Sequence, residues 1–158
     1  MQIILDKQQY DKIWDRVYSE FGFRRTEAEW LCLPLKQKRY HLSGIWTAAQ
    51  EQLVNSIFIG LGFRQMYALD WQHDCFVYTP EEQISPDDSY YDAARECNVY
   101  FPSYYPDGDF HFFLTQDFRY GLFGHPWRAE IIVMGDALIE AFENQKAQLL
   151  LSDVNEGA

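Results

Sequence analysis

A chain of 158 residues is long enough for one domain with a conventional hydrophobic core. Hydrophobic residues make up 47% of it and aromatic residues 18%, a composition that excludes global disorder. The formal net charge of -11 argues against nucleic acids and anionic membranes as partners, because their phosphates would repel the protein.

The acidic excess is concentrated in the middle of the chain. Residues 1–40 carry eight Lys and Arg against six Asp and Glu, whereas residues 70–117 carry eleven acidic residues and one basic residue, Arg95. Two interpretations stay open for this stretch. It is either a solvated surface that favours solubility or a docking face for a cationic protein.

The chain begins with a strong helix signal. Asp6 is a typical N-cap, apolar residues recur at helical spacing as far as Phe21, and Gly22 is a natural helix end. An aromatic stripe at this spacing is typical of a helix face that packs on a core.

The next segments predict a strand, a turn and a second helix. Residues 27–35 (EAEWLCLPL) have strand composition, and Pro34 suggests an edge or an end of a sheet. A second amphipathic helix is expected over residues 46–59. The turn between them is expected to hold a basic cluster made of Lys36, Lys38 and Arg39.

The second half of the chain predicts short strands followed by a helix. Residues 80–96, rich in Pro, Asp, Glu and Ser, are expected to form a surface loop. Asp136 is expected to cap a last helix that includes Leu149. The predicted strands are 63–71, 75–80, 98–101, 109–114, 119–123 and 130–135.

These elements predict an α+β fold. The connections between strands are too short for crossover helices, so we expect a mainly antiparallel sheet of about five to six strands. Helices at the N-terminus, in the middle and at the C-terminus would pack on it. Residues 1–151 are expected to form a single α+β domain, with 152–158 as a frayed C-terminal tail.

The chain is expected to be soluble and cytoplasmic. Its apolar stretches do not reach the roughly 18 residues of a membrane span, and its first residues lack the basic region of a signal peptide. The three cysteines, Cys32, Cys75 and Cys97, are too scattered for a disulfide framework or a paired metal motif.

No familiar catalytic motif is present, so we predict no catalytic residue, no cofactor and no metal. His73 and Cys75 would face the same side of a strand and could both ligate zinc, but further ligands among Cys97, His111 and His125 would be a guess. A cysteine nucleophile at Cys75 would need a base and an oxyanion site that the sequence does not show. A turn histidine beside a buried cysteine is the simpler interpretation.

The segment 104–127 (YYPDGDFHFFLTQDFRYGLFGHPW) is unusually aromatic. Asp107 and Asp109 flank a glycine after a proline, a turn signature in which the aspartates bond to the local backbone. Residues 110–123 predict a hairpin with His111 and Phe113 on one face. His125 precedes a proline at the end of a strand, where it would lock a corner.

Three blocks resemble a known family. Residues 67–80 (YALDWQHDCFVYTP), 101–127 and 130–142 (EIIVMGDALIEAF) are similar to the DUF2716 family of bacterial proteins. The WQH and GHPW blocks, in this order and spacing, carry the resemblance, which is best over residues 63–142. It implies a bacterial cytosolic α+β domain and supplies no mechanism.

Our first hypothesis is a binding protein without catalysis, a bacterial immunity protein that neutralises a basic, nuclease-type toxin. Tyrosines would anchor the toxin in the interface and aspartates would steer its approach. The expected contact residues are Tyr78, Asp87, Asp88, Tyr90, Tyr91, Asp92, Tyr104 and Tyr105.

The alternative is an enzyme or small-ligand binder with an aromatic and histidine-lined pocket. This hypothesis requires its side chains to converge on one cavity, and it fails if His111 and His125 lie on opposite faces of the sheet. A homo-oligomeric structural module is a third hypothesis. The expected pocket residues are Trp71, His73, His111, His125 and Trp127.

Overall fold

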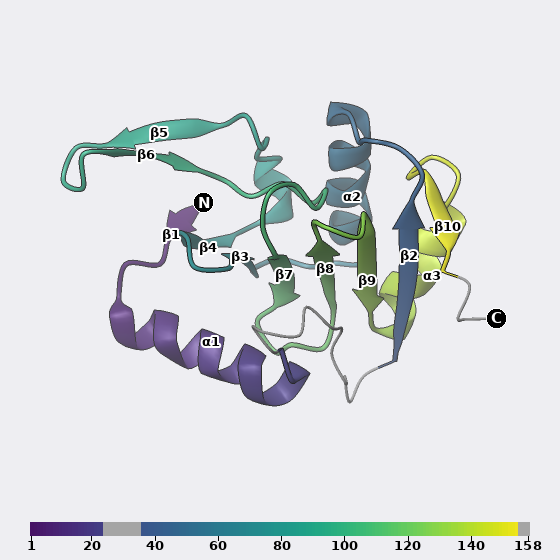
Figure 1. Ribbon diagram of the computed structural model, residues 1–158, viewed down its shortest axis with the longest axis horizontal. Helices are drawn as coiled ribbons and strands as arrows, with labels where there is room; N and C mark the ends of the chain where they lie inside the picture. The colour runs from purple at the N-terminus through teal and green to yellow at the C-terminus, as the bar shows by residue number, and fades with distance from the viewer. Residues whose placement is uncertain (24–35, 155–158) are drawn as a thin grey trace.

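A computed structural model describes residues 1–23 and 36–154. In this part of the chain one large antiparallel sheet has the strand order β1-β4-β3-β7-β8-β9-β2-β10, and β5 and β6 form a separate hairpin (Figure 1). The strands are β1 (Gln2–Ile3), β2 (Gln37–Leu42), β3 (Met66–Asp70), β4 (Cys75–Tyr78), β5 (Ser89–Asp92), β6 (Cys97–Tyr100), β7 (His111–Thr115), β8 (Gly121–His125), β9 (Glu130–Met134) and β10 (Leu151–Asp153). The predicted α+β class and antiparallel pairing are confirmed, with more strands than the five to six expected.

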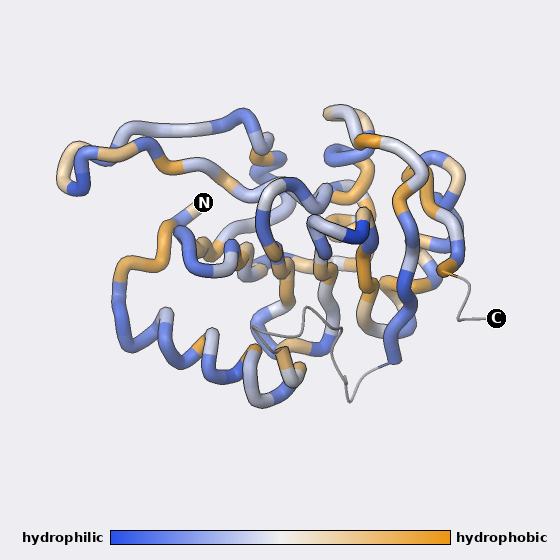
Figure 2. The backbone as a smooth tube through the Cα atoms, in the orientation of Figure 1, coloured by the Kyte–Doolittle hydropathy of each residue, from blue (hydrophilic) through white to orange (hydrophobic). Residues whose placement is uncertain are grey.

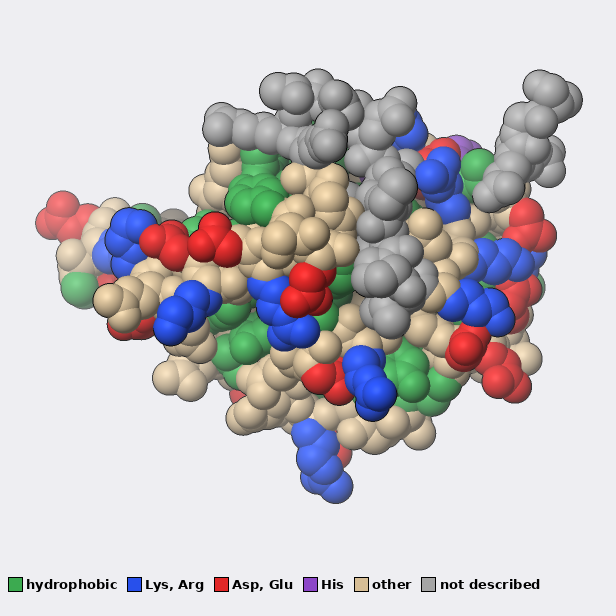
Figure 3. Space-filling view, turned by 90° about the horizontal axis from the view of Figure 1, so that it is seen from below, with side chains coloured by type: hydrophobic (Ala, Val, Ile, Leu, Met, Phe, Trp, Pro, Cys, Tyr) green, Lys and Arg blue, Asp and Glu red, His purple; other side chains and the backbone are tan. Residues whose placement is uncertain are grey.

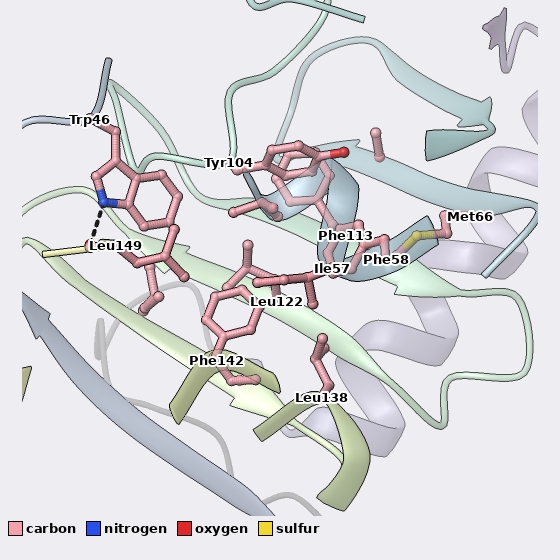
Figure 4. Close-up of a cluster of buried hydrophobic side chains, with 14 of the residues drawn as sticks. Trp46, Ile57, Phe58, Met66, Tyr104, Phe113, Leu122, Leu138, Phe142 and Leu149 are labelled. Carbon is pink, nitrogen blue, oxygen red and sulfur yellow. Dashed lines mark hydrogen bonds between the residues drawn. The ribbon is translucent and has the colours of Figure 1, made fainter. Parts of the chain in front are cut away.

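Three helices among the described residues cover both faces of the sheet: α1 (Lys7–Phe21), α2 (Ala48–Gly60) and α3 (Asp136–Asn144). Strand β7 shows the division. Its Phe112 and Leu114 pack in a cluster with residues of α1, whereas Phe113 packs in a second cluster with residues of α2 and α3. Figure 2 shows the apolar strands at the centre of the molecule, and Figure 4 shows the second cluster. His111 and Phe113 therefore share a face, as predicted.

The first two helices begin as their sequences indicate. The Asp6 side chain accepts a hydrogen bond from the Gln9 backbone N–H (2.7 Å), and Gly22 ends α1 with a φ of 60°. Helix α2 begins one residue after its N-cap, Thr47. Trp46 lies outside this helix and donates its indole N–H to the Leu149 carbonyl at 2.7 Å (Figure 4).

Several segment predictions are wrong. Lys38 and Arg39 of the basic cluster lie in β2, not in a turn, and Lys36 directly precedes that strand. The strand forms because Tyr40 and Leu42 bury alternate positions. Residues 80–96 are not only a loop, since they contain a 3₁₀ turn (Pro80–Glu82) and strand β5. The polar composition of β5 hid it, because this strand pairs only with β6 and its residues are mostly exposed.

The C-terminal predictions also need correction. Gly135, not Asp136, is the N-cap of α3, and Leu149 lies beyond the end of that helix. Residues 152 and 153 are not frayed, because β10 pairs with β2 in the large sheet. The strand predicted over residues 27–35 lies outside the described residues. No helix in the described part of the chain has the length and apolar character to cross a membrane.

Candidate functional site

A hairpin arm extends from the body of the protein (Figure 1). We define the arm as residues 87–100, which hold β5, β6 and the acidic approach to β5. Its exposed aromatic residues are Tyr90 (41% exposed), Tyr91 (62%) and Tyr100 (60%), and Asp87 and Asp88 are exposed as well. Five of the eight residues expected to contact a partner therefore belong to this arm.

Arg95 ties the arm to the turn between β3 and β4. Its guanidinium N–H groups bond to both carboxylate oxygens of Asp74, at 2.8 and 3.2 Å. Its Nε donates to Asp92 at 2.7 Å, and this hydrogen bond lowers the pKa of Asp92. Asp92 therefore holds Arg95 in place within the arm. It is only partly exposed.

Tyr78 and Tyr104 are not surface anchors, which corrects the sequence prediction. They are 3% and 2% exposed, because both belong to the second cluster. Tyr104 packs there against Phe58 of α2 (Figure 4), and Tyr78 packs against Phe101 and Phe113. Their hydroxyls lie 2.9 Å apart, and Tyr104 also donates to the Asn55 side chain at 2.6 Å. Tyr105 is half-buried against Trp46.

The five residues expected to line a pocket do not converge. His111 and Gly124 are register partners, so the side chain of His125, next to Gly124, lies on the opposite face of the sheet from that of His111. His125 packs against Phe110 and Trp127. Trp127 is 73% exposed, although its ring also contacts Phe110.

Trp71 also lies away from His111. Its ring contacts Phe23 and Phe110, and its indole N–H donates to the Tyr18 hydroxyl at 3.1 Å, so it belongs to the α1 side of the sheet. The expected pocket residues therefore fall into separate groups: His73 and His111 both lie near Asp70, whereas His125 and Trp127 contact each other.

His73 and His111 meet two carboxylates at the junction of β3 and β7. Asp70 ends β3 and is the register partner of His111, which begins β7. The Asp70 Oδ1 lies 3.2 Å from His73 Nδ1 and 3.7 Å from His111 Nε2, and the Asp109 Oδ2 lies 3.3 Å from His73 Nδ1. We call these four residues the Asp-His cluster.

Backbone groups orient two members of the Asp-His cluster. His111 is 5% exposed, and its Nδ1 lies 2.9 Å from the Ser103 carbonyl oxygen. Since a carbonyl only accepts, this nitrogen carries the proton. The Asp109 Oδ1 accepts from the Phe110 N–H at 2.8 Å, which leaves its Oδ2 to face His73.

A glycine lets the segment that supplies Ser103 lie close to the sheet. A Cβ atom added to Gly124 would lie 2.9 Å from the Pro106 Cβ. The chain around Pro106 can therefore pack directly on β8, where a larger residue would push it away.

Burial changes the ionisation of Asp70. Desolvation raises its pKa, while the nearby His111 and His73 lower it and so offset part of the effect. A carboxylate in this position gains from any positive charge placed between it and the histidines.

A surface pocket of about 500 Å³ adjoins the Asp-His cluster. The body contributes Asp70 and His73 to its lining, and the arm contributes Asn98 and Tyr100. Solvent and small solutes can therefore reach the cluster between the arm and the turn after β3.

Cys75 does not join the cluster. Its thiol is buried and lies 3.7 Å from the carbonyl oxygens of Asp70 and His73, so it faces backbone rather than an imidazole. Burial raises its pKa to about 11, which keeps the sulfur protonated at neutral pH. Neither the zinc pairing with His73 nor a cysteine nucleophile is supported by this geometry.

Sequence reasoning missed Asp70 and assigned Asp109 only to the local backbone. The signal was weak but present, because Asp70 precedes His73 by three residues and Asp109 precedes His111 by two. What the sequence lacked was the pairing of β3 with β7, which places the two segments side by side.

The face that carries α1 has a different character from the arm. Lys and Arg side chains are interspersed there with Asp and Glu (Figure 3). Lys7 pairs with Asp11, and Arg16 with Glu20. This face is therefore a mixed, solvated surface rather than an acidic one.

Together, the fold and the site define an antiparallel α+β protein with an acidic, aromatic arm and an Asp-His cluster beside it. The chain belongs to the family described as "Protein of unknown function (DUF2716)", whose sequence model matches residues 4–139. This confirms the resemblance noted from the sequence.

One relative is the Uncharacterized protein YxiI of Bacillus subtilis (strain 168). It is 35% identical over 104 residues, a match that covers 65% of this chain and 59% of YxiI. The chain thus matches less than two thirds of that relative's length. No solved structure matches the chain.

Proposed function

We propose that the protein is a non-catalytic protein-binding domain, an immunity protein that neutralises a basic, nuclease-type toxin in the bacterial cytoplasm. The observation that carries this proposal is the arm, where Tyr90, Tyr91 and Tyr100 are exposed on a hairpin outside the large sheet. Exposed tyrosines of this kind supply large contact area at low entropic cost.

The acidic character of the arm indicates that the expected partner is positively charged. The arm and the segments beside it lie in the stretch with eleven acidic residues and one basic residue, and that basic residue, Arg95, is already paired with Asp74 and Asp92. A negative field speeds the approach of a cationic surface and repels nucleic acid. A nuclease is basic where it grips its substrate, so an acidic arm can compete for that surface.

Capture from the native host tests the proposal. The tagged wild-type chain should retain a basic protein from the host lysate, and the purified complex should have lost nuclease activity. A triple variant of the arm, Asp87→Asn with Tyr91→Ala and Glu96→Gln, should retain far less of it. Retention should also fall with added salt, because exposed charges are screened.

The matched control removes a charge elsewhere. Glu140 is exposed on α3, outside the arm, so Glu140→Gln should retain the partner as well as the wild type does. Equal capture by the arm variant, or capture of nothing except a second copy of this chain, would sink the proposal.

A further inference from the structure

Three members of the Asp-His cluster have the donor spacing of a metal site. The potential ligand atoms of Asp70, His73 and Asp109 all lie within 4.8 Å of one another. In a tetrahedral zinc site with bonds of about 2.0–2.1 Å, neighbouring ligand atoms lie about 3.3 Å apart. The distances from His73 Nδ1 to the two carboxylates, 3.2 and 3.3 Å, match that spacing.

His111 supplies an independent observation. Its Nδ1 donates to the Ser103 carbonyl, so the lone pair of the neutral ring is on Nε2. That nitrogen belongs to a side chain that is 6% exposed, and it faces the Asp70 Oδ1 at 3.7 Å, which is too long for a hydrogen bond. A lone pair and a carboxylate oxygen would then face each other, an arrangement that a cation between them stabilises.

The hydrogen bonds that orient His111 and Asp109 are of the kind that orient metal-ligating side chains. A metal-bound histidine commonly donates its other ring N–H to a backbone carbonyl, as His111 does to Ser103. A ligating carboxylate is commonly held through its second oxygen, as Asp109 is by the Phe110 N–H. Both residues are therefore oriented before any ion binds.

We propose that Asp70, His73, Asp109 and His111 bind one divalent transition-metal ion, with zinc as the best match. Two imidazole nitrogens and two carboxylate oxygens suit zinc, whereas calcium and magnesium prefer an all-oxygen shell. The pocket beside Asp70 and His73 gives the ion a path from solvent. This site is separate from the proposed toxin-binding function, which rests on the arm.

Titration of the full chain with metal tests the proposal. After removal of any affinity tag and treatment with a chelator, the protein should bind one Zn²⁺ per chain by calorimetry. Co²⁺ should give the strong visible absorption bands of a four-coordinate site. Zinc should also raise the melting temperature, because it binds the folded state.

Substitution of two of the proposed ligands tests whether they bind the ion. The His73 side chain is 61% exposed, so His73→Ala should fold normally, and Asp109→Asn keeps an oxygen for the Phe110 N–H. Each should weaken zinc binding by more than about 10-fold, since even outer-shell changes cost that much. His41 is exposed on β2 away from the cluster, so His41→Ala should bind zinc like the wild type.

Two results would overturn the metal site. One is the absence of zinc and cobalt binding to a wild-type chain whose circular dichroism is that of a folded protein. The other is equal affinity of the wild type, His73→Ala and Asp109→Asn. In either case the Asp-His cluster would be a set of ordinary polar contacts that binds no metal ion.

Discussion

At the residue scale, Glu51 shows how a charged group can hold a core together. It is 8% exposed at the start of α2, and its two oxygens accept from the backbone N–H groups of Tyr104 and Tyr105, each at 3.0 Å. Burial raises its pKa, and those two hydrogen bonds offset part of that effect. The carboxylate thus fixes the chain after β6 on α2.

We expect Glu51→Ala to destabilise the protein by about 2–3 kcal/mol, because two buried donors lose their acceptor. The midpoint of urea unfolding measures this change. Glu140→Ala, at an exposed site on α3, is the control and should shift stability by less than about 0.5 kcal/mol. Similar midpoints for both variants would show that water replaces the Glu51 carboxylate without cost.

Cys75 is a second case at this scale. Its buried thiol has a pKa of about 11, so the reactive thiolate is scarce at pH 8. In a Cys32→Ser background we expect Ellman's reagent to label the partly exposed Cys97 much faster than Cys75. Mass spectrometry would locate the label, and unfolding in guanidinium should equalise the two rates. Fast labelling of native Cys75 would contradict its burial.

At the element scale, an ion-pair network fastens the C-terminal segments to β2. Lys38 on β2 pairs with Glu143 on α3 and with Asp153 on β10, and Lys146 pairs with Asp153. The Tyr40 hydroxyl donates to Glu143 at 2.7 Å. The hydrogen bond from Lys38, followed by that from Tyr40, lowers the pKa of Glu143.

The lowered pKa of Glu143 determines how the stability of the protein changes with pH. A carboxyl group whose folded pKa lies below its usual value of 4.5 stabilises the protein above that pH, and the stabilisation is lost as the pH falls through the folded pKa. We therefore expect the melting temperature to drop below about pH 4.5. Glu143→Gln should melt lower than the wild type at pH 7 and vary less in acid, and Glu140→Gln should follow the wild type. Parallel curves for Glu143→Gln and the wild type would refute the assignment.

At the scale of the whole molecule, the notable property is that the central strands β7, β8 and β9 are buried on both faces of the sheet. Many antiparallel sheets leave one face in water, but here α1 covers one face and α2 and α3 the other (Figure 1). Adjacent residues of β7, Phe112 and Phe113, are both fully buried in consequence.

We expect Phe112→Ala and Phe113→Ala each to cost about 3–5 kcal/mol, because each leaves a cavity in a different cluster. Tyr91→Ala on the arm is the matched aromatic control and should cost much less. Chemical denaturation measures all three free energies of unfolding. A small effect at one of the two β7 positions would mean that one side of the sheet is loosely packed.

The elements with strong local signals were predictable. The cap at Asp6, the glycine after α1 and the alternation along β7 depend on neighbours within a few residues, so the sequence states them directly. Strands β5 and β10 were missed, because their pairing with β6 and β2 has to be known before their short polar sequences can be read as strands.

By itself, the sequence determined the α+β class, the antiparallel sheet, the family and the acidic, aromatic nature of the central stretch. The class, the sheet and the nature of that stretch follow from composition and local periodicity, and the family follows from the resemblance carried by the WQH and GHPW blocks. The tertiary structure alone decided that Tyr78 and Tyr104 are buried while Tyr90 and Tyr91 are exposed, and that His111 meets Asp70 rather than His125. The reason is that register and helix packing set which face each side chain occupies, and both depend on contacts between residues far apart in the chain.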